Sequence, residues 1–260
     1  MPAMSPSDLW IDIEGSVATV RLSRSEKRNA LHLDLVNRIG RFFAEPPPGI
    51  RAAVLLGEGA HFCAGLDLDE NRRRTVFEAM ENSSAWHRAF DQIEHGRVPV
   101  VAALHGAVIG GGLELALTAH VRVADSSAYY SLPEGRIGIF VGGGGSVRIA
   151  RVLGSDRMRE MMLTGRRLMA DDGQRLGISH ELVTNGETVS RAQEIALQIA
   201  GNAPLTNQLI LTALPRIGDM SSSDGLWAEA LATAVTQSTE DAIEGMRALL
   251  EKRPPKFRGV

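Results

Sequence analysis

Two glutamates stand among neighbours that favour chemistry over simple solvation. Glu114 follows three glycines, residues 110–112, in the segment GAVIGGGLELAL, and apolar Leu113 and Leu115 flank it. Glu134 lies twenty positions later in the segment YYSLPEG, where a strand pattern ends. Two carboxylates that lie close together titrate as a coupled pair, so one can stay protonated while the other is ionised. Such a pair can supply a general acid and a general base to one site.

The glycines before Glu114 favour an anion site. They lie between an apolar strand and an apolar helix, so unpaired N–H groups gather at a helix N-terminus without side chains to block a ligand. Glu114 follows Gly111 by three residues, which places its side chain on the same helix face as the Gly111 N–H. The segment FCAGLDL, residues 62–68, offers another tight turn, where the Ala64 N–H is the expected second donor.

Each of these features also has a purely structural interpretation. Glu114 could be a solvated helix residue, although its apolar neighbours favour burial, and Glu134 could be an exposed loop residue. Residues 142–145 are four glycines, but no GK[ST] follows, so we interpret them as a close-packed wall of the active site instead of a nucleotide loop. His61 and Cys63 lack an orienting third group, which argues against a thiol–base pair.

The pattern of apolar residues predicts an α/β fold that positions these segments. Alternation over residues 9–22 predicts a half-buried hairpin, and the spacing over residues 33–43 predicts a helix that ends before three prolines. Continuous apolar runs predict buried strands at residues 52–56 and 98–104, and shorter ones at residues 121–124 and 129–132. Their recurrence suggests stacked strand-strand-helix units.

The end of the chain has a different character, because strand patterns disappear after about residue 190. Helices are expected at residues 191–203, 205–213, 226–237 and 241–252, the last with a capping box of Ser238 and Asp241. We therefore predict a core at residues 1–195 and a C-terminal helical region at residues 196–260.

Composition excludes several classes of protein. A net charge of −3 and a pI near 6.2 argue against a nucleic-acid surface, and the basic run Arg72-Arg73-Arg74 is interpreted as a solvated face. One cysteine and the absence of CxxC and HExxH motifs argue against disulfides and a metal site, which favours a reducing, cytoplasmic location. The first residues lack a signal-peptide pattern.

Residues 98–117 are long and apolar enough to suggest a membrane span. His105 and Glu114 would then lie in hydrocarbon at a high cost, and three successive glycines would weaken the helix. A buried strand that leads into a buried helix is the better interpretation, so no membrane is expected.

Four segments, FCAGLDL, GAVIGGGLELAL, LPEG and EKRPPKF, resemble the signature segments of the crotonase superfamily, the enoyl-CoA hydratase/isomerase family, in their order and spacing. The resemblance covers nearly the whole chain. It implies a crotonase-like spiral of strand-strand-helix repeats with a C-terminal helical oligomerisation region. It also implies addition of water across the 2,3 double bond of a 2-enoyl-CoA to give a 3-hydroxyacyl-CoA, a reaction of fatty acid metabolism.

The resemblance assigns roles to the residues singled out above. The N–H groups of Ala64 and Gly111 would form the oxyanion hole for the thioester oxygen, and Glu114 and Glu134 would be the catalytic pair. Hydration needs a base for water, an acid for the α-carbon and stabilisation of the enolate between them. The family suggests Glu114 as base and Glu134 as acid, although the sequence leaves open which does which.

Substrate and subunit contacts are also implied by the resemblance. CoA contacts are expected from Lys27, Arg28, Ala30 and Leu66, and from Lys252 to the CoA of a neighbouring subunit. The acyl-CoA thioester is then the substrate, and no separate cofactor or metal is expected. Relatives form homotrimers, or hexamers of two trimers.

One departure from the family pattern concerns the acyl pocket. Relatives commonly carry proline where Val141 stands, which suggests a subgroup with its own substrate, such as methylthioacryloyl-CoA. Residues 70–90, with Phe77, Met80, Trp86 and Phe90, are expected to shape the acyl end.

Alternatives remain within and outside this chemistry. An enoyl-CoA isomerase, dehalogenase, decarboxylase or thioester hydrolase would share the oxyanion hole, while the presence of both glutamates favours hydration. A non-catalytic RNA-binding or scaffold homologue would need a larger basic patch around residues 72–74 and would leave both glutamates without a role.

Overall fold

The computed structural model describes residues 8–70 and 74–260. Within these ranges a six-stranded sheet has the order β1-β2-β3-β4-β6-β9. Its strands are β1 (Leu9–Glu14), β2 (Val17–Leu22), β3 (Ala52–Gly57), β4 (Val100–Leu104), β6 (Val121–Asp125) and β9 (Glu181–Val183). The first two strands form an antiparallel hairpin, as predicted, and the other neighbours pair in parallel.

A smaller sheet supplies the second strand of a repeated strand-strand-helix unit. Its described strands, in the order β5-β7-β8, are β5 (Ala107–Ile109), β7 (Tyr129–Ser131) and β8 (Arg167–Met169). In the chain β4 is followed by β5 and then α3, and β6 is followed by β7 and then α4. The predicted succession of strand, strand and helix is therefore confirmed.

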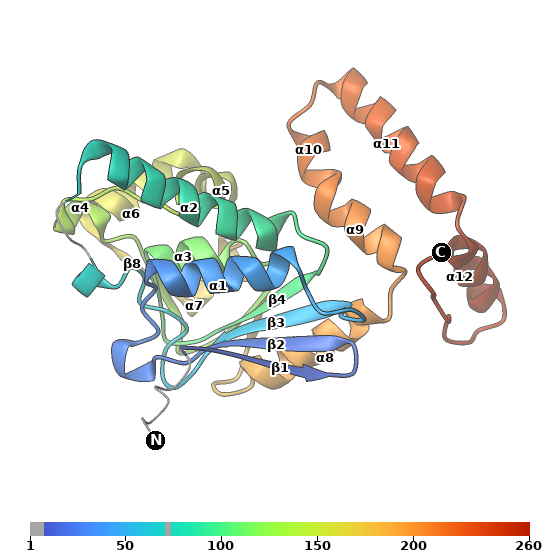
Figure 1. Cartoon of the computed structure of the whole chain (residues 1–260), viewed down its shortest axis with the longest axis horizontal. Helices are drawn as coiled ribbons and strands as arrows, with labels where there is room; N and C mark the ends of the chain where they lie inside the picture. Colours follow the sequence, from blue (N-terminus) through green and yellow to red (C-terminus); the bar gives the residue numbers. More distant parts are fainter. Residues whose placement is uncertain (1–7, 71–73) are drawn as a thin grey trace.

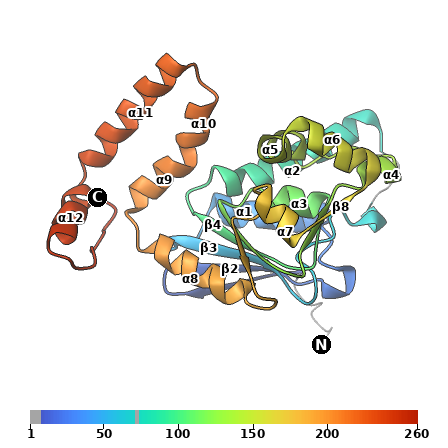
Figure 2. The same ribbon diagram turned by 180° about the vertical axis from the view of Figure 1, so that it is seen from behind.

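Helices cover both faces of the larger sheet. Figures 1 and 2 show α1, α2 and α3 over one face and α8 against the other. The described helices are η1 (Ser25–Lys27), α1 (Leu33–Ala44), η2 (Leu68–Glu70), α2 (Val76–Glu94), α3 (Gly111–Ala116), α4 (Glu134–Ile137), α5 (Gly145–Leu153), α6 (Ser155–Thr164), α7 (Ala170–Arg175), α8 (Thr188–Ala200), α9 (Pro204–Thr212), α10 (Leu214–Gly218), α11 (Ser222–Gln237) and α12 (Glu240–Leu250).

The apolar patterns match the burial that they predict, except at the edge of the sheet. Every residue of β3 is buried, because helices cover it on both sides. Strand β1 is the edge strand of the sheet, and its Ile11 and Ile13 are 40% and 46% exposed. The predicted hairpin is therefore present, but its outer strand is more exposed than the alternation suggests.

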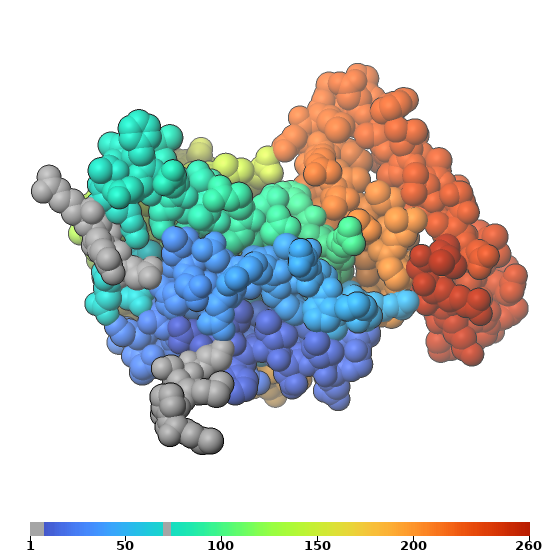
Figure 3. All heavy atoms as spheres, in the orientation of Figure 1, coloured from blue at the N-terminus to red at the C-terminus, as the bar shows by residue number. Residues whose placement is uncertain are grey.

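The C-terminal helices leave the core later than predicted. The expected boundary at residue 195 falls inside α8, whose buried Ala192, Ala196 and Ala200 pack against the sheet in a core cluster of its own. Figures 1 and 3 show α9 to α12 as an arm beside the body of the molecule. The helical region that stands apart from the core thus begins with α9.

The cap of α12 corrects a second prediction. Its N-cap residue is Thr239, whose hydroxyl accepts the Ala242 N–H at 3.0 Å, while the Ser238 hydroxyl donates to the Val235 carbonyl of the preceding helix. The capping box that was expected from Ser238 is therefore wrong by one residue. The two helices are joined closely enough that Ser238 still belongs to the end of α11.

Two sequence hypotheses concern surfaces and membranes. Arg72 and Arg73 of the basic run lie outside the described residues. In the part of the chain that the structure describes, no helix has the length and apolar character needed to cross a membrane.

Candidate active site

Glu114 is held as a buried carboxylate by the glycine run that follows Glu134 in the chain. The side chain projects from α3 with only 3% of the residue exposed. Its Oε1 accepts the N–H of Gly143 at 2.8 Å and the N–H of Gly145 at 2.7 Å. Burial raises the pKa of Glu114, and the backbone N–H groups of Gly145, Gly143 and Gly142 act against that rise by stabilising the ionised form.

The absence of side chains in this glycine run is what lets the backbone reach Glu114. A Cβ added to Gly145 would lie 2.8 Å from both Cγ and Oε1 of Glu114, and one added to Gly143 would lie 2.9 Å from the Phe90 ring. By contrast, a Cβ on Gly142 would meet only the Ser83 hydroxyl, at 3.8 Å. The sequence prediction of a close-packed wall is confirmed, and its physical role is to bind the Glu114 carboxylate.

Glu134 begins the short helix α4 and faces the same site with an unused oxygen. The residue is 4% exposed, and its buried Oε2 has no hydrogen-bond partner among the described residues. Burial raises the pKa of Glu134 to about 7, and the nearby charge of Glu114 contributes to the same rise. The two glutamates therefore interact electrostatically, and Glu134 is the one without N–H donors on its outer oxygen.

The backbone donor predicted at Ala64 is used elsewhere. The Ala64 N–H donates to the Arg28 carbonyl at 2.9 Å, so it ties the turn to the preceding loop and does not face the site. That prediction is therefore wrong. Two residues later, the Leu66 N–H has no partner among the described residues, and a Cβ on Gly111 would approach the Leu66 nitrogen to 3.5 Å. Leu66 and Gly111 thus bring two backbone N–H groups together.

Backbone pairing fixes this turn against β5. The Cys63 N–H donates to the Ala107 carbonyl at 2.9 Å, and the Cys63 carbonyl accepts the Ile109 N–H at 3.1 Å. Gly65 then turns the chain with φ of 95°, where a Cβ would lie 2.7 Å from the Ile109 carbonyl oxygen. Only glycine allows this approach, which places Leu66 beside the start of α3.

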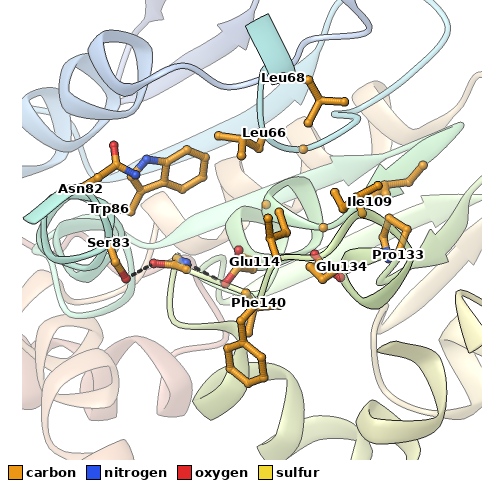
Figure 4. A pocket seen from close by; sticks show the side chains of 18 of the residues that line it. Leu66, Leu68, Asn82, Ser83, Trp86, Ile109, Glu114, Pro133, Glu134 and Phe140 are labelled. Atoms are coloured by element: carbon orange, nitrogen blue, oxygen red, sulfur yellow. Dashed lines mark hydrogen bonds between the residues drawn. The ribbon is translucent and has the colours of Figure 1, made fainter. Parts of the chain in front are cut away.

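These groups open into one pocket with a volume of about 450 Å³, part of which Figure 4 shows. Helix α2 supplies Trp86 to the lining. Its ring packs against Gly111 so closely that a Cβ added to Gly111 would lie 3.0 Å from the ring edge. Phe77 and Met80, which were expected to shape the pocket, point to solvent with 78% and 61% exposure. The lining residues with side chains are Ala64, Leu66, Leu68, Arg74, Ala79, Asn82, Ser83, Trp86, Ile109, Glu114, Pro133, Glu134, Ile137, Ile139, Phe140 and Val141.

The residues expected to contact CoA fall into two groups. Lys27, Arg28 and Ala30 lie in the loop that is hydrogen-bonded to the turn of Leu66, and the Lys27 ammonium is bonded to the Asp69 carboxylate. Leu66 itself lines the pocket. The remaining residue, Lys252, follows α12 in the C-terminal arm, and Figure 1 shows α12 at the opposite end of the molecule from α4.

Other chemistries find less support in the site. Burial raises the pKa of the Cys63 thiol to about 12, so a thiolate nucleophile is not available there. Across residues 8–70 and 74–260, no group of three His, Cys, Asp or Glu side chains is placed to hold a metal. The site therefore offers two coupled carboxylates and two free N–H donors, which suits proton transfer next to a developing oxyanion.

The fold and this site define an enzyme of the crotonase class. Residues 12–260 match the model of the family described as enoyl-CoA hydratase/isomerase, and the chain belongs to this family.

Three similar proteins illustrate the match. A crystal structure of a provisionally named enoyl-CoA hydratase from Rhodopseudomonas palustris is 50% identical, covers 95% of this chain and 96% of its own, and has a TM-score of 0.92. The enoyl-CoA hydratase structure from Bacillus anthracis is 30% identical, with 98% and 100% covered and a TM-score of 0.91. The short-chain-enoyl-CoA hydratase of Clostridium acetobutylicum is 31% identical over 253 residues, which cover 96% of this chain and 97% of that protein.

Proposed function

We propose that this protein is an enoyl-CoA hydratase, which adds water across the 2,3 double bond of a 2-enoyl-CoA to give a 3-hydroxyacyl-CoA. The observation that carries the proposal is the convergence of two buried, interacting glutamates on a pocket with two free N–H groups. Membership of the enoyl-CoA hydratase/isomerase family supports it. A cytoplasmic location and a role in fatty acid metabolism stay predictions from the sequence.

Glu114 is the general base in this proposal. Its Oε1 accepts two backbone N–H groups, which favour the ionised carboxylate over the protonated form. The carboxylate takes a proton from water as the water oxygen bonds to C3 of the enoyl group. The electrons of the 2,3 double bond move toward the thioester oxygen.

Glu134 is the general acid. Its raised pKa keeps a share of the carboxyl group protonated near neutral pH, and its free Oε2 can carry the proton without losing a hydrogen bond within the protein. It donates that proton to C2 of the enolate, so the product gains one hydrogen at C2 and one hydroxyl at C3. After product leaves, Glu114 carries the proton taken from water and Glu134 is ionised, so passage of one proton from Glu114 to Glu134 through a water molecule restores the starting state.

The enolate oxygen is assigned to the N–H groups of Leu66 and Gly111. Both donors are backbone groups without a partner among the described residues, and they are fixed by the pairing of the 63–66 turn with β5. Preorganised N–H donors of this kind stabilise charge that develops in the transition state, at about 10²- to 10³-fold in rate per donor.

The test of the proposal is the loss of enoyl-thioester absorbance on crotonyl-CoA, with the product identified as 3-hydroxybutyryl-CoA by mass spectrometry. Turnover to the hydrated thioester is the expected result. Release of free CoA without hydration would instead indicate a thioester hydrolase, and migration of the double bond in a 3-enoyl-CoA would indicate an isomerase.

A change in the glycine run tests how the base is held. Gly145→Ala is expected to lower kcat by about 10- to 100-fold, because the added Cβ displaces the Glu114 carboxylate from its N–H donors. Gly142→Ala is the matched control in the same run, since its Cβ meets only the Ser83 hydroxyl at 3.8 Å. Rates measured on crotonyl-CoA check both, and an equal fall in the two variants would contradict the assignment.

CoA contacts are proposed for the loop beside the oxyanion hole. Lys27, Arg28 and Ala30 lie next to the turn of Leu66, so a thioester bound at Leu66 would lead its CoA portion past this loop. Lys252 follows α12 in the C-terminal arm, and its contact with the CoA of a neighbouring subunit is proposed from the resemblance to the family.

A homotrimer, or a hexamer of two trimers, is proposed for the assembled enzyme. The C-terminal arm exposes many large apolar side chains, which in a monomer would remain in water. They are Ile210, Leu214, Met220, Leu226, Trp227, Leu231, Val235, Ile243, Met246, Leu249 and Leu250. The number of subunits follows the resemblance to the family.

Light scattering after gel filtration checks the assembly. The expected mass is three or six times that of the 28.0 kDa chain. Trp227→Asp, which places a charge on the apolar arm, is expected to shift the mass toward the monomer, while Asp12→Asn on the exposed edge strand is not. A monomeric wild-type protein at micromolar concentration would refute the proposal.

A further inference from the structure

Helix α2 presents a polar side chain to the pocket that hydration itself does not use. Ala79, Asn82, Ser83 and Trp86 line the pocket from one face of this helix. The Ser83 hydroxyl donates to the Gly142 carbonyl at 2.7 Å, so its proton is engaged. The Asn82 carboxamide has no hydrogen-bond partner in the described part of the chain, and Figure 4 shows it next to Trp86 at one end of the pocket.

The surroundings of Asn82 determine what can occupy that end. The residue is half-buried, and much of the remaining lining is apolar, including Phe140 and Val141 from the loop after α4. A plain alkyl chain would pack against the apolar lining but would remove water from the Asn82 amide without replacing its hydrogen bonds. A polar group that is desolvated without a partner costs binding free energy, whereas one that finds a partner does not.

We propose that Asn82 selects 2-enoyl-CoA substrates whose acyl chain carries a hydroxyl or carbonyl oxygen beyond the double bond. The carboxamide donates through Nδ2 and accepts through Oδ1, so it can bond either kind of oxygen. The inference rests on the proposed hydratase function and names the substrate class of the same site. Asn82 is a specificity residue here, and the two glutamates retain the chemistry.

Matched substrate pairs test the inference. The kcat/KM of crotonyl-CoA, trans-2-pentenoyl-CoA and trans-2-hexenoyl-CoA is compared with that of the same thioesters carrying a hydroxyl at the terminal carbon. The wild type is expected to favour the hydroxylated member by about 10-fold at one chain length or more. Asn82→Leu, which keeps a side chain of similar size, is expected to raise kcat/KM for the plain members and to abolish that preference.

A neighbouring residue gives the control. Glu81 is exposed on α2 and does not line the pocket, so Glu81→Leu makes the same kind of change outside the site and should keep the wild-type preference. Thermal melting of both variants checks that α2 is intact, since a general loss of folding would lower both members of a pair equally.

The outcomes separate this inference from the proposed function. Hydration of plain enoyl-CoAs without a preference for the hydroxylated partner at any length would overturn the role of Asn82 alone. So would an Asn82→Leu variant that melts like the wild type and whose kcat/KM falls equally for both members of each pair. Failure to hydrate any thioester of the panel, plain or hydroxylated, would overturn the hydratase function and the inference with it.

Discussion

Glu114→Gln is expected to lower kcat for the hydration of crotonyl-CoA by about 10²- to 10⁴-fold, the range for removal of a general acid or base. The amide has nearly the shape of the carboxylate, and its oxygen can still accept the N–H groups of Gly143 and Gly145. It cannot take a proton from water. The variant therefore removes the base while it keeps the hydrogen bonds from the Gly143 and Gly145 N–H groups, and KM should change much less than kcat.

Two comparisons make this result specific. Glu81→Gln, at an exposed position of α2, should keep the wild-type rate because it lies outside the pocket. The double variant with Glu134→Gln should lose less than the product of the two single losses, because residues that act as a unit are not additive. A Glu114→Gln variant with a wild-type rate would exclude the base assigned here.

Much of the site could be predicted because its signals are local. Three glycines at the start of an apolar helix, followed by Glu114, indicate a buried carboxylate beside free N–H groups without any knowledge of distant segments. The glycine run after Glu134 is equally visible. Which group that run binds depends on tertiary structure, because Gly143 and Gly145 meet Glu114 only when α3 and α5 pack together.

The second N–H donor shows why the remainder could not be predicted. Ala64 and Leu66 lie in the same turn, and no local pattern tells which N–H is free. The Ala64 N–H is occupied because it donates to the carbonyl of Arg28, which comes from a distant part of the chain. The Leu66 N–H is therefore the one that stays free among the described residues. In the same way, the pocket role of Asn82 and the exposure of Phe77 depend on how α2 is rotated about its axis against the core, which periodicity gives only approximately.

The end of the core was predicted too early because α8 carries little apolar signal in the sequence. The alanines of α8 carry a weak apolar signal because they are small, yet small side chains are what allow a helix to pack closely on the sheet. The change from strands to helices near residue 190 was visible in the sequence, but it does not mark the point where the chain leaves the core. That point lies after α8.

Glu134→Gln is expected to lower kcat by about 10²- to 10⁴-fold and to remove a pH dependence that the wild type should show. Because the acid must be protonated to donate to C2, wild-type kcat/KM should fall as pH rises through about 7, the pKa of Glu134. On the acid side the rate should fall as Glu114 becomes protonated, at a pH above the ordinary range for glutamate because burial raises its pKa. The two limbs belong to the coupled pair.

The same raised pKa predicts an effect on stability that is independent of turnover. The folded state binds the Glu134 proton more tightly than the unfolded chain, so the free energy of unfolding falls as pH rises from about 4.5 to above 7. Glu134→Gln removes this term, because its amide stays neutral. Its Tm relative to the wild type should therefore be higher at pH 8 than at pH 5, while Glu81→Gln should show no such change. If the Tm difference for Glu134→Gln were the same at both pH values, the raised pKa would be refuted, and with it the reason for assigning Glu134 as the acid.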